Sequence, residues 1–428
     1  MVQNPYVVKT IVMSSGERLP MLIELATGEP LYEPSLYVLS EIRATNRASS
    51  TIDHVLRSIM VLQLYLDLAR IDIERRFQEG WVLSLSEIDE LVRHCRRSVA
   101  EQLRAGGASG SSQAVHLGSA NVVRYARRGR APIEVAGHTA ANRVRAIRDY
   151  LDWLVRYRMA RYQPSSAEGA GLWDDWKRCK EALDARVPRH KGRNAIGRRE
   201  GLSPEVVSRL LSVTSPDSPE NPWKGGSTRI RNSLVIRWLL ELGLRRGELL
   251  NVKITDINFQ SEELLVARRA DDPQDPRKDQ PKVKTRDRKL PVSSHLCAMT
   301  HDYITKTRRL IPGAKRHPFL FVAMGTGAPL SLSSVNCLFA ELREAFPDEF
   351  FAVTPHVLRH TWNDHFSEIM DKAKVTEPEE EQMRSFLTGW SPTSKTALNY
   401  TRRHVRLKAQ RVSLQMQAEQ VKGVTNGD

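Results

Sequence analysis

The chain has 428 residues, of which 40% are hydrophobic, enough for the cores of two ordinary domains, which excludes a disordered polypeptide. Its formal net charge of +15 predicts a polyanionic partner. The four cysteines have no Cys-x-x-Cys or Cys/His ligand spacing, which argues against a disulfide scaffold and a structural zinc site. No apolar run approaches the roughly 18 residues of a membrane span. We therefore expect a soluble protein of the reducing cytosol.

The positive charge is concentrated in one part of the chain. Residues 121–200 hold 19 Lys or Arg against 9 Asp or Glu. Such a band is typical of a surface that binds a phosphate backbone. Charge alone leaves open the alternative of a solvated, solubilising surface.

The chain begins with a predicted hairpin. Residues 6–13 and 18–24 are strand-like, and the polar residues 14–17 between them fit a turn. Helical spacing comes next, and we expect Ser50 to cap the first helix. The apolar face of that helix comprises Ile52, Val55, Leu56, Ile59, Leu62 and Leu66.

Two more helices complete a predicted N-terminal helical domain. Ser84 and Glu87 have the spacing of a capping box, which predicts a helix that runs towards Leu103. A third helix covers about 139–162, with Val144, Ile147, Leu151 and Leu154 directed inwards. Its candidate DNA-binding side chains are Arg143, Arg145, Arg148 and Arg156.

A basic linker is predicted at 186–201. The segment lacks apolar periodicity, and its charge suggests that it lies on DNA. Its candidate DNA-binding residues are Arg189, Lys191 and Arg193.

A second domain is predicted from about Leu202. A helix over about 228–242 turns Leu234, Trp238 and Leu239 to one side, and Gly243 ends it. Strand-like segments are next, at 263–268, about 281–285 and 289–292, with a charged insertion at 270–279. From Leu296 onwards the pattern is mostly helical.

Several residues of this second domain suit phosphodiester cleavage by a tyrosine. Such a site needs a phenol aimed at phosphorus, cationic donors on the non-bridging oxygens and a proton donor for the leaving 5′ oxygen. Arg245 comes directly after a helix end, and Glu248 one turn later can orient its guanidinium or help to prepare a leaving group. The alternative is an exposed arginine that begins an ordinary amphipathic helix.

The sequence Thr354-Pro355-His356-Val357-Leu358-Arg359-His360 predicts a helix that begins at Pro355. The spacing of three and four would place His356, Arg359 and His360 on one face, where they could hold one phosphate. A metalloprotease zinc site would need an adjacent glutamate and a third ligand that this motif lacks. A helix-surface cluster of no catalytic role is the alternative.

A lysine and a tyrosine complete the candidate set. Lys284 lies in a segment, 281–291, that fits two short strands around a tight turn, from which a lysine could protonate a leaving hydroxyl. Lys282 is the reserve, and such lysines often contact only backbone phosphates. Tyr400 is the candidate nucleophile, although an isolated tyrosine near a helix end is usually structural. Trp390 considered alone is more often a core residue.

In chain order these residues resemble the motif set of the tyrosine recombinases, the phage-integrase-like site-specific recombinases. That family has an Arg in a Gly-Leu-Arg-x-x-Glu segment, a hairpin Lys, a His-x-x-Arg-His box, a His or Trp, and a nucleophilic Tyr. The matching residues are Arg245 with Glu248, Lys284, His356, Arg359, His360, Trp390 and Tyr400. Trp390 stands where most members have histidine, and the interval to Tyr400 is about one residue longer than usual.

The resemblance implies a mainly α fold with a small antiparallel sheet: a helical (SAM-like) core-binding domain and a mixed α+β catalytic domain that clamp DNA in a C shape. The implied segments are an N-terminal β-hairpin extension at 1–31, the core-binding domain at 32–185, the linker at 186–201, the catalytic domain at 202–404 and a helical tail at 405–428. The tail residues Leu407, Val412, Leu414 and Met416 have helical spacing.

The resemblance also implies an activity. A recombinase of a mobile element, an integrase or a transposase, would cleave and rejoin duplex DNA through a 3′-phosphotyrosyl bond and a Holliday junction, without cofactor or metal. The implied partners are double-stranded recombination sites, three further copies in a homotetramer, and in some systems accessory recombinases, all in a prokaryotic cytosol near the nucleoid. Two alternatives stay open: a catalytically weak DNA-binding subunit beside other recombinases, and a relaxing enzyme like a type IB topoisomerase.

Overall fold

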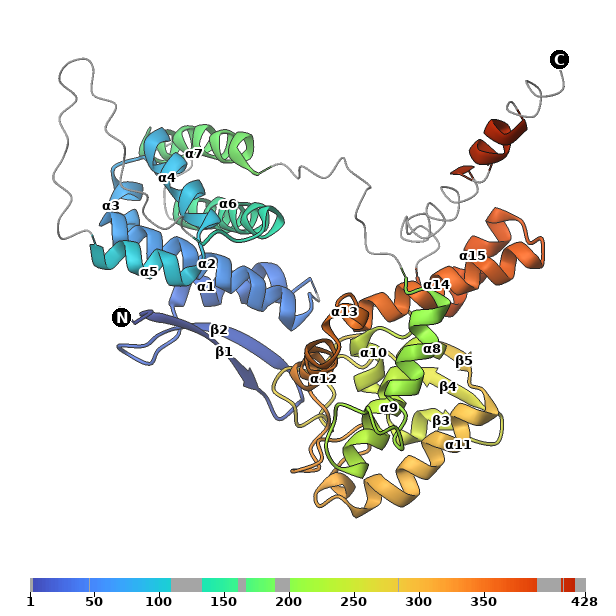
Figure 1. Ribbon diagram of the computed structural model, residues 1–428. Coiled ribbons are helices and arrows are strands. Elements are labelled where there is room, and N and C mark those ends of the chain that lie inside the picture. The colour runs from blue at the N-terminus through green and yellow to red at the C-terminus, as the bar shows by residue number, and fades with distance from the viewer. Residues whose placement is uncertain are drawn as a thin grey trace, which may run out of the picture. The chain divides into compact units, whose positions relative to one another are not determined.

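The computed structural model describes residues 3–45, 47–108, 133–160, 167–188, 201–283, 285–390, 409–410 and 412–419. It divides into two compact units. The first holds the described residues up to 188 except Ser14–Glu17, and the second holds that short segment and the described residues from 201 onwards. Figure 1 shows the helices and strands of each unit. Among the described residues, no helix has both the length and the apolar character needed to cross a membrane.

The first unit consists of a β-hairpin and a group of helices. Its elements are β1 Tyr6–Val12, β2 Arg18–Glu24, α1 Tyr32–Tyr37, a π-helical turn Val38–Arg43, α2 Ser49–Ala69, α3 Ile73–Gln78, α4 Leu85–Arg96, α5 Val99–Ala108, α6 Gly137–Met159 and α7 Ala167–Arg186. The predicted hairpin is present and antiparallel, with Tyr6 opposite Glu24 and Val12 opposite Arg18. Leu22 of β2 is fully buried, and β2 packs on α2.

The core of this unit lies between α2, α4, α6 and α7. The inward residues predicted for α6 are all buried, and so is Ile59 of α2. Trp176 of α7 is also fully buried, and its indole N–H donates to Asp152 of α6 at 2.8 Å. A buried aromatic nitrogen is therefore paired, as burial requires.

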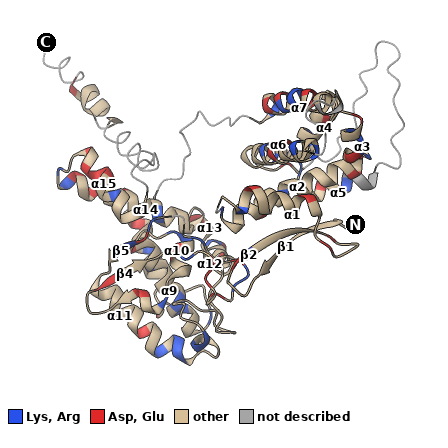
Figure 2. Ribbon diagram, turned by 180° about the vertical axis from the view of Figure 1, so that it is seen from behind, with Lys and Arg blue, Asp and Glu red and all other residues tan. Residues whose placement is uncertain are grey.

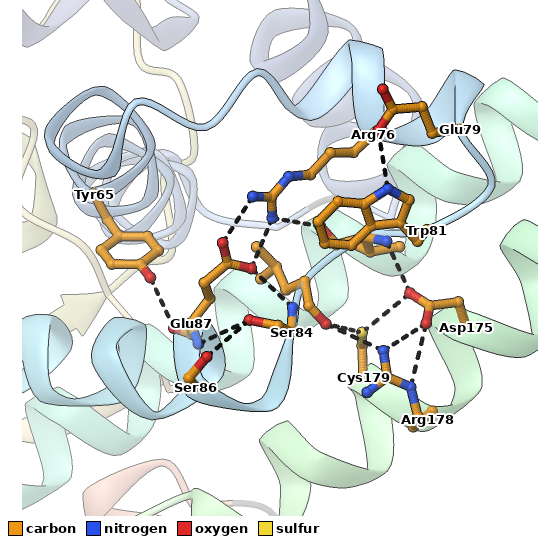
Figure 3. Close-up of polar contacts among 12 residues, drawn as sticks. Tyr65, Arg76, Glu79, Trp81, Ser84, Ser86, Glu87, Asp175, Arg178 and Cys179 are labelled. Carbon is orange, nitrogen blue, oxygen red and sulfur yellow. Dashed lines mark hydrogen bonds and ion pairs between the residues drawn. The ribbon is translucent and has the colours of Figure 1, made fainter.

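A polar network fixes the connection between α3 and α4 (Figure 3). Both terminal nitrogens of Arg76 donate to the Glu87 carboxylate at 2.7 Å. Glu87 also accepts from the Ser84 amide, completing the predicted capping box. On the other side of the connection, Asp175 of α7 accepts from the Val82 amide at 2.8 Å. Helix α7 thus holds a loop that would otherwise leave backbone donors unpaired.

Two helical predictions for this unit need correction. Helix α2 begins after Ala48, so Ser50 lies within its first turn and does not cap it. The predicted helix from Ser84 stops at Arg96, because Arg97 is extended, and α5 starts anew at Val99. Arg97 pairs in an isolated bridge with a residue that precedes α6, a long-range contact that local periodicity does not reveal.

The second unit surrounds a short sheet with helices. Its elements are α8 Pro204–Val213, α9 Gly226–Glu241, α10 Arg246–Asn251, β3 Ile257–Asn258, β4 Glu263–Val266, β5 Arg288–Pro291, α11 Ser294–Asp302, α12 Leu332–Ala345, α13 Pro347–Phe350, α14 Pro355–Lys372 and α15 Glu377–Thr388. The strands form an antiparallel sheet in the order β3-β4-β5. The described tail residues 409–410 and 412–419 are helical, which fits the predicted spacing.

Helix α9 is the centre of this unit. Leu234, Trp238 and Leu239 are buried as predicted, and α9 contacts α10, α11 and α14. Because α9 is packed on several sides, the position of the residues that follow it is also fixed. The residues just after α9 begin the candidate site.

The predicted hairpin around Lys284 is wrong in its strands. Residues 281–283 and 285 are not extended strand, and β5 pairs instead with β4, with Val266 opposite Arg288. The connection therefore spans 267–287. The ion pairs Lys253–Asp272 and Arg269–Asp256 fix it to the domain. Arg277, which pairs with Asp275 inside the connection, also donates to the carbonyl oxygens of Leu250 and Leu330. These charged residues of the insertion are thus paired with each other or with the domain.

Candidate active site around Glu248

The Gly-Leu-Arg segment joins the end of α9 to the start of α10. Gly243 has φ +59°, and a side chain there would lie 2.5 Å from the Trp362 ring. Only glycine fits both the left-handed backbone and this close approach. Arg245 then occupies the N-cap position of α10, and its amide donates to Glu248 at 3.0 Å. The Gly-Leu-Arg segment therefore links the end of α9 directly to the start of α10.

Glu248 is the centre of the site, although its side chain is fully buried. Its carboxylate accepts from Arg245 Nη1 at 3.2 Å, from Arg288 Nη2 at 2.9 Å and from Thr285 Oγ1 at 2.7 Å. Arg359 Nη1 lies 3.9 Å away. Burial alone would raise the pKa of this carboxyl, but Arg288 and Arg359 outweigh it and lower the pKa to about 2. Glu248 is thus a fixed anion that orients arginines.

Helix α14 supplies the His-x-x-Arg-His residues. Thr354 caps it by accepting from the Val357 amide at 3.2 Å, and Pro355 is at its first turn, as predicted. Arg359 is buried and donates from Nη1 to the Gly243 carbonyl oxygen at 2.5 Å. The arginine of the box is therefore tied to the end of α9 beside Arg245.

The two histidines of the box contact each other. The Nε2 atoms of His356 and His360 lie 3.0 Å apart, with His356 exposed and His360 half-buried. In such a bond one Nε2 carries a proton and donates while the other Nε2 accepts, so one proton lies between the two rings. The prediction of one common face holds for the histidines, whereas Arg359 lies deeper, towards Glu248.

Trp390 joins the same group from the end of α15. The helix ends at Gly389, whose φ is +69°, and the Trp390 amide donates to the Ser385 carbonyl oxygen at 3.0 Å. The Trp390 side chain is 6% exposed, and the Arg359 guanidinium carbon lies 5.6 Å from its ring centroid. A cation over an indole face is attractive and holds both groups in place. Trp390 thus belongs to the candidate site as well as to the core.

Other predicted residues lie outside the described part of the chain. These are Lys284, Tyr400, Arg189, Lys191 and Arg193. The reserve lysine, Lys282, is described and half-buried, with its carbonyl oxygen against Gly247 of α10. A side chain on Gly247 would approach that oxygen to 2.6 Å, so the segment that precedes Lys284 lies close to the start of α10.

Sequence reasoning missed Arg288 and Thr285, which both bind Glu248. A signal for Arg288 was present in the strand. Residues 288–291 alternate between buried and exposed, with the apolar Leu290 inside, so the same period of two places Arg288 inside as well.

The candidate DNA-binding arginines of α6 have different surroundings. Figure 2 shows basic and acidic residues interspersed along α6 and α7. Arg143 donates to the carbonyl oxygens of Cys95 and Arg97 and so caps the end of α4. The other three bind polar side chains within the unit: Arg148 pairs with Asp149 and Asp184, Arg156 pairs with Asp152, and Arg145 donates to Asn142 at 3.3 Å. Of the four, Arg145 is exposed and lies in no ion pair between described residues.

A metal site does not emerge from the described residues, where no three His, Cys, Asp or Glu side chains gather closely enough to hold an ion. The four cysteines are free, and three of them are buried.

Comparison with known proteins finds a family match for part of the chain. Residues 200–377 match the model of the phage integrase family. Tyrosine recombinase XerA of Pyrococcus furiosus is 27% identical over 169 residues, which are 40% of this chain and 48% of that relative. The chain therefore aligns with about half of the length of this curated relative.

Two solved structures that contain DNA are similar to this chain. The Tn1549 transposon integrase in complex with transposon right end DNA is 15% identical, over 90% of this chain and 100% of that one, with a TM-score of 0.48. The XerH site-specific recombinase bound to its difH substrate is 14% identical, over 87% and 82% of the two chains, also with a TM-score of 0.48.

Proposed function

We propose that this chain, whose residues 200–377 match the phage integrase family, is a site-specific DNA recombinase with Tyr400 as its nucleophile. The observation that carries the proposal is the convergence of Arg245 and Arg359, the two arginines of the family motif, on one buried carboxylate. Such preorganised cations stabilise the charge that develops on a phosphate under attack.

The arrangement supports phosphodiester cleavage by a tyrosine. The Tyr400 phenol releases its proton to solvent as its oxygen attacks phosphorus, the bond to the 5′ oxygen breaks, and DNA becomes joined to the protein by a 3′-phosphotyrosyl bond. Arg245 and Arg359 grip the non-bridging oxygens with the planar guanidinium fork, and the His356–His360 pair donates a hydrogen bond beside them. Trp390 keeps Arg359 in place. Lys284, or Lys282 in reserve, delivers the proton to the leaving 5′ oxygen.

The covalent bond keeps the energy of the broken phosphodiester, so a 5′ hydroxyl of a partner strand can reverse the step. Strand exchange then passes through a Holliday junction. We propose that a homotetramer performs this exchange on two duplex sites and that each protomer clamps its duplex with both units. The proposed source of such a recombinase is a mobile element, as the motif resemblance implies.

The proposal is tested by covalent trapping. Nicked suicide duplexes from the DNA that flanks the gene are incubated with the wild-type protein, and an SDS-resistant, shifted band is sought. Tyr400→Phe should bind the same duplexes and give no band. Tyr32→Phe is the matched control, because Tyr32 is an exposed tyrosine of the first unit, and it should give a wild-type band.

Two outcomes would overturn the proposal. A band that persists in Tyr400→Phe would remove Tyr400 from its role. Firm binding without a band on any flanking sequence would favour the catalytically weak DNA-binding subunit.

A further inference from the structure

Arg288 connects three separate segments of the second unit from a buried position. Its Nε donates to the Leu387 carbonyl oxygen of α15 at 2.7 Å. Nη1 donates to Thr285 Oγ1 at 3.0 Å, and Nη2 donates to Glu248 of α10 at 2.9 Å. The Arg288 side chain is 3% exposed. One guanidinium thus joins the end of α15, the loop before β5 and the carboxylate that orients Arg245.

A second contact docks the end of α15 at the same place. The Arg286 amide donates to the Gly389 carbonyl oxygen at 3.0 Å. A side chain on Gly389 would lie 2.9 Å from both Arg288 Nη1 and Thr285 Cβ, and φ at Gly389 is +69°. The helix end therefore approaches Arg288 as closely as a glycine permits.

The residues after Gly389 make this dock relevant to the reaction. Trp390 is the next residue and packs under Arg359, and Tyr400 comes ten residues later in the sequence. We propose, on the basis of the proposed function, that Arg288 is a positioning residue for DNA cleavage. It docks the end of α15 onto Glu248, and this dock aligns Trp390, from which the chain continues to Tyr400, with the arginines that hold the phosphate.

Lysine cannot replace arginine in this role. The three acceptors of Arg288 lie in different directions, and the rigid guanidinium fork reaches all of them with separate N–H groups. The compact ammonium of a lysine would keep its charge near Glu248 and lose the bond to Leu387. The substitution Arg288→Lys therefore keeps the ion pair while releasing the helix end.

The experiment compares two changes on the two sides of this dock with a matched control. Arg288→Lys removes the hydrogen bond between residue 288 and the end of α15. Gly389→Ala disturbs the same dock from the α15 side, because the added methyl group would clash with Arg288 and Thr285. Arg308→Lys is the control, because Arg308 is also a buried arginine of this unit but donates to backbone carbonyls of Ala314, His317 and Phe319. It measures the cost of losing a buried arginine as such.

The first readout is the single-turnover rate of covalent complex formation on saturating nicked duplex, with DNA affinity measured separately. A misplacement of about 1 Å slows a reaction by about 10²-fold, so we expect a rate loss of that order in Arg288→Lys and in Gly389→Ala with unchanged DNA affinity. The double variant should be no slower than the slower single variant, because both break one dock. Arg308→Lys should keep the wild-type rate at saturation.

A wild-type rate in Arg288→Lys, an equal loss in Arg308→Lys, or multiplying losses in the double variant would each overturn the inference. The second readout does not depend on activity: hydrogen exchange of the Arg286 and Trp390 amides in the free protein. Exchange should rise in Arg288→Lys and stay unchanged in Arg308→Lys, and unchanged exchange in Arg288→Lys overturns the dock itself. A wild-type protein that forms no covalent complex would instead refute the proposed function, while the exchange result still judges the dock.

Discussion

Glu248 shows how a buried charge can serve a site without touching its substrate. Its oxygens are occupied by Arg245, Arg288 and Thr285, so no oxygen is directed to a phosphate. The expectation that this carboxylate orients a guanidinium fits these contacts, whereas help with a leaving group does not. Its negative charge offsets the repulsion among neighbouring guanidinium groups, which otherwise could not lie so close.

Replacing this carboxylate gives a prediction with a defined pH dependence. Folding lowers the pKa of Glu248 from 4.5 to about 2, so its contribution to stability is complete above pH 4.5 and is lost as the pH falls towards 2. The shift corresponds to about 3 kcal/mol. Glu248→Gln should lower the free energy of unfolding at neutral pH by that order. The deficit should shrink through the acid range, as followed by urea denaturation at a series of pH values. A deficit that is constant in pH would contradict the assignment.

At the scale of elements, the arginine–carboxylate pair of α15 fixes this helix on α14. Arg384 is fully buried and pairs with Glu380 within α15. Its Nη1 also donates to the Asn363 carbonyl and side-chain oxygens of α14 at 3.1 and 3.0 Å, and Nη2 donates to Ser367. The helix that leads to Trp390 is therefore held at its middle by Arg384 and at its end by Arg288.

Removing one member of this pair should be costly. Arg384→Met leaves the Glu380 carboxylate buried with fewer partners, and breaking a buried pair costs about 3–5 kcal/mol. We expect that loss in the unfolding free energy of the second unit. The double variant Arg384→Met with Glu380→Leu should regain part of it, because no uncompensated charge then remains. A single variant as stable as wild type would show that the pair is dispensable.

The sequence predicts elements well where the signal is local. The structure has the capping box at Ser84, the glycine after the end of α9 and the proline at the start of α14 at the predicted positions. Helix α7 was missed, although Leu172, Trp176, Cys179 and Leu183 have helical spacing and are fully buried. This local spacing is sufficient to predict the helix.

Other features could not be read from local patterns. The connection 267–287 is held by ion pairs between residues distant in sequence, such as Lys253 with Asp272, which no periodicity reveals. The motif identified the candidate residues Arg245 and Arg359. Their shared carboxylate and the role of Arg288 required three-dimensional contacts, because α9, α14 and β5 lie far apart along the chain.

At the scale of the whole molecule, the charge of +15 supports the proposed DNA partner. The α6 arginines refine where contact is expected. Arg143 already serves two carbonyl oxygens of the first unit, and Arg148 and Arg156 lie beside carboxylates. Arg145 is exposed and has no such carboxylate partner among the described residues, which makes it the best candidate of the four for a phosphate contact.

Salt dependence tests this contact. Each phosphate contact contributes about 0.9 to the slope of log affinity against log salt concentration. Arg145→Gln should reduce the magnitude of that slope by about 0.9 and weaken binding equally on specific and unrelated duplexes. The control is Arg57→Gln on α2, an exposed arginine that already pairs with Asp53, and it should leave the slope unchanged. Equal slopes for Arg145→Gln and wild type would exclude the contact.

The most direct test of the central claim is to identify the amino acid that carries the DNA. The complex trapped on a nicked duplex is digested with protease and nuclease, and the nucleotide-bearing peptide is sequenced by mass spectrometry. We expect the nucleotide on Tyr400, joined through its 3′ phosphate, with a free 5′ hydroxyl on the released strand. A nucleotide on any other residue, or a bond through a 5′ phosphate, would contradict cleavage by Tyr400.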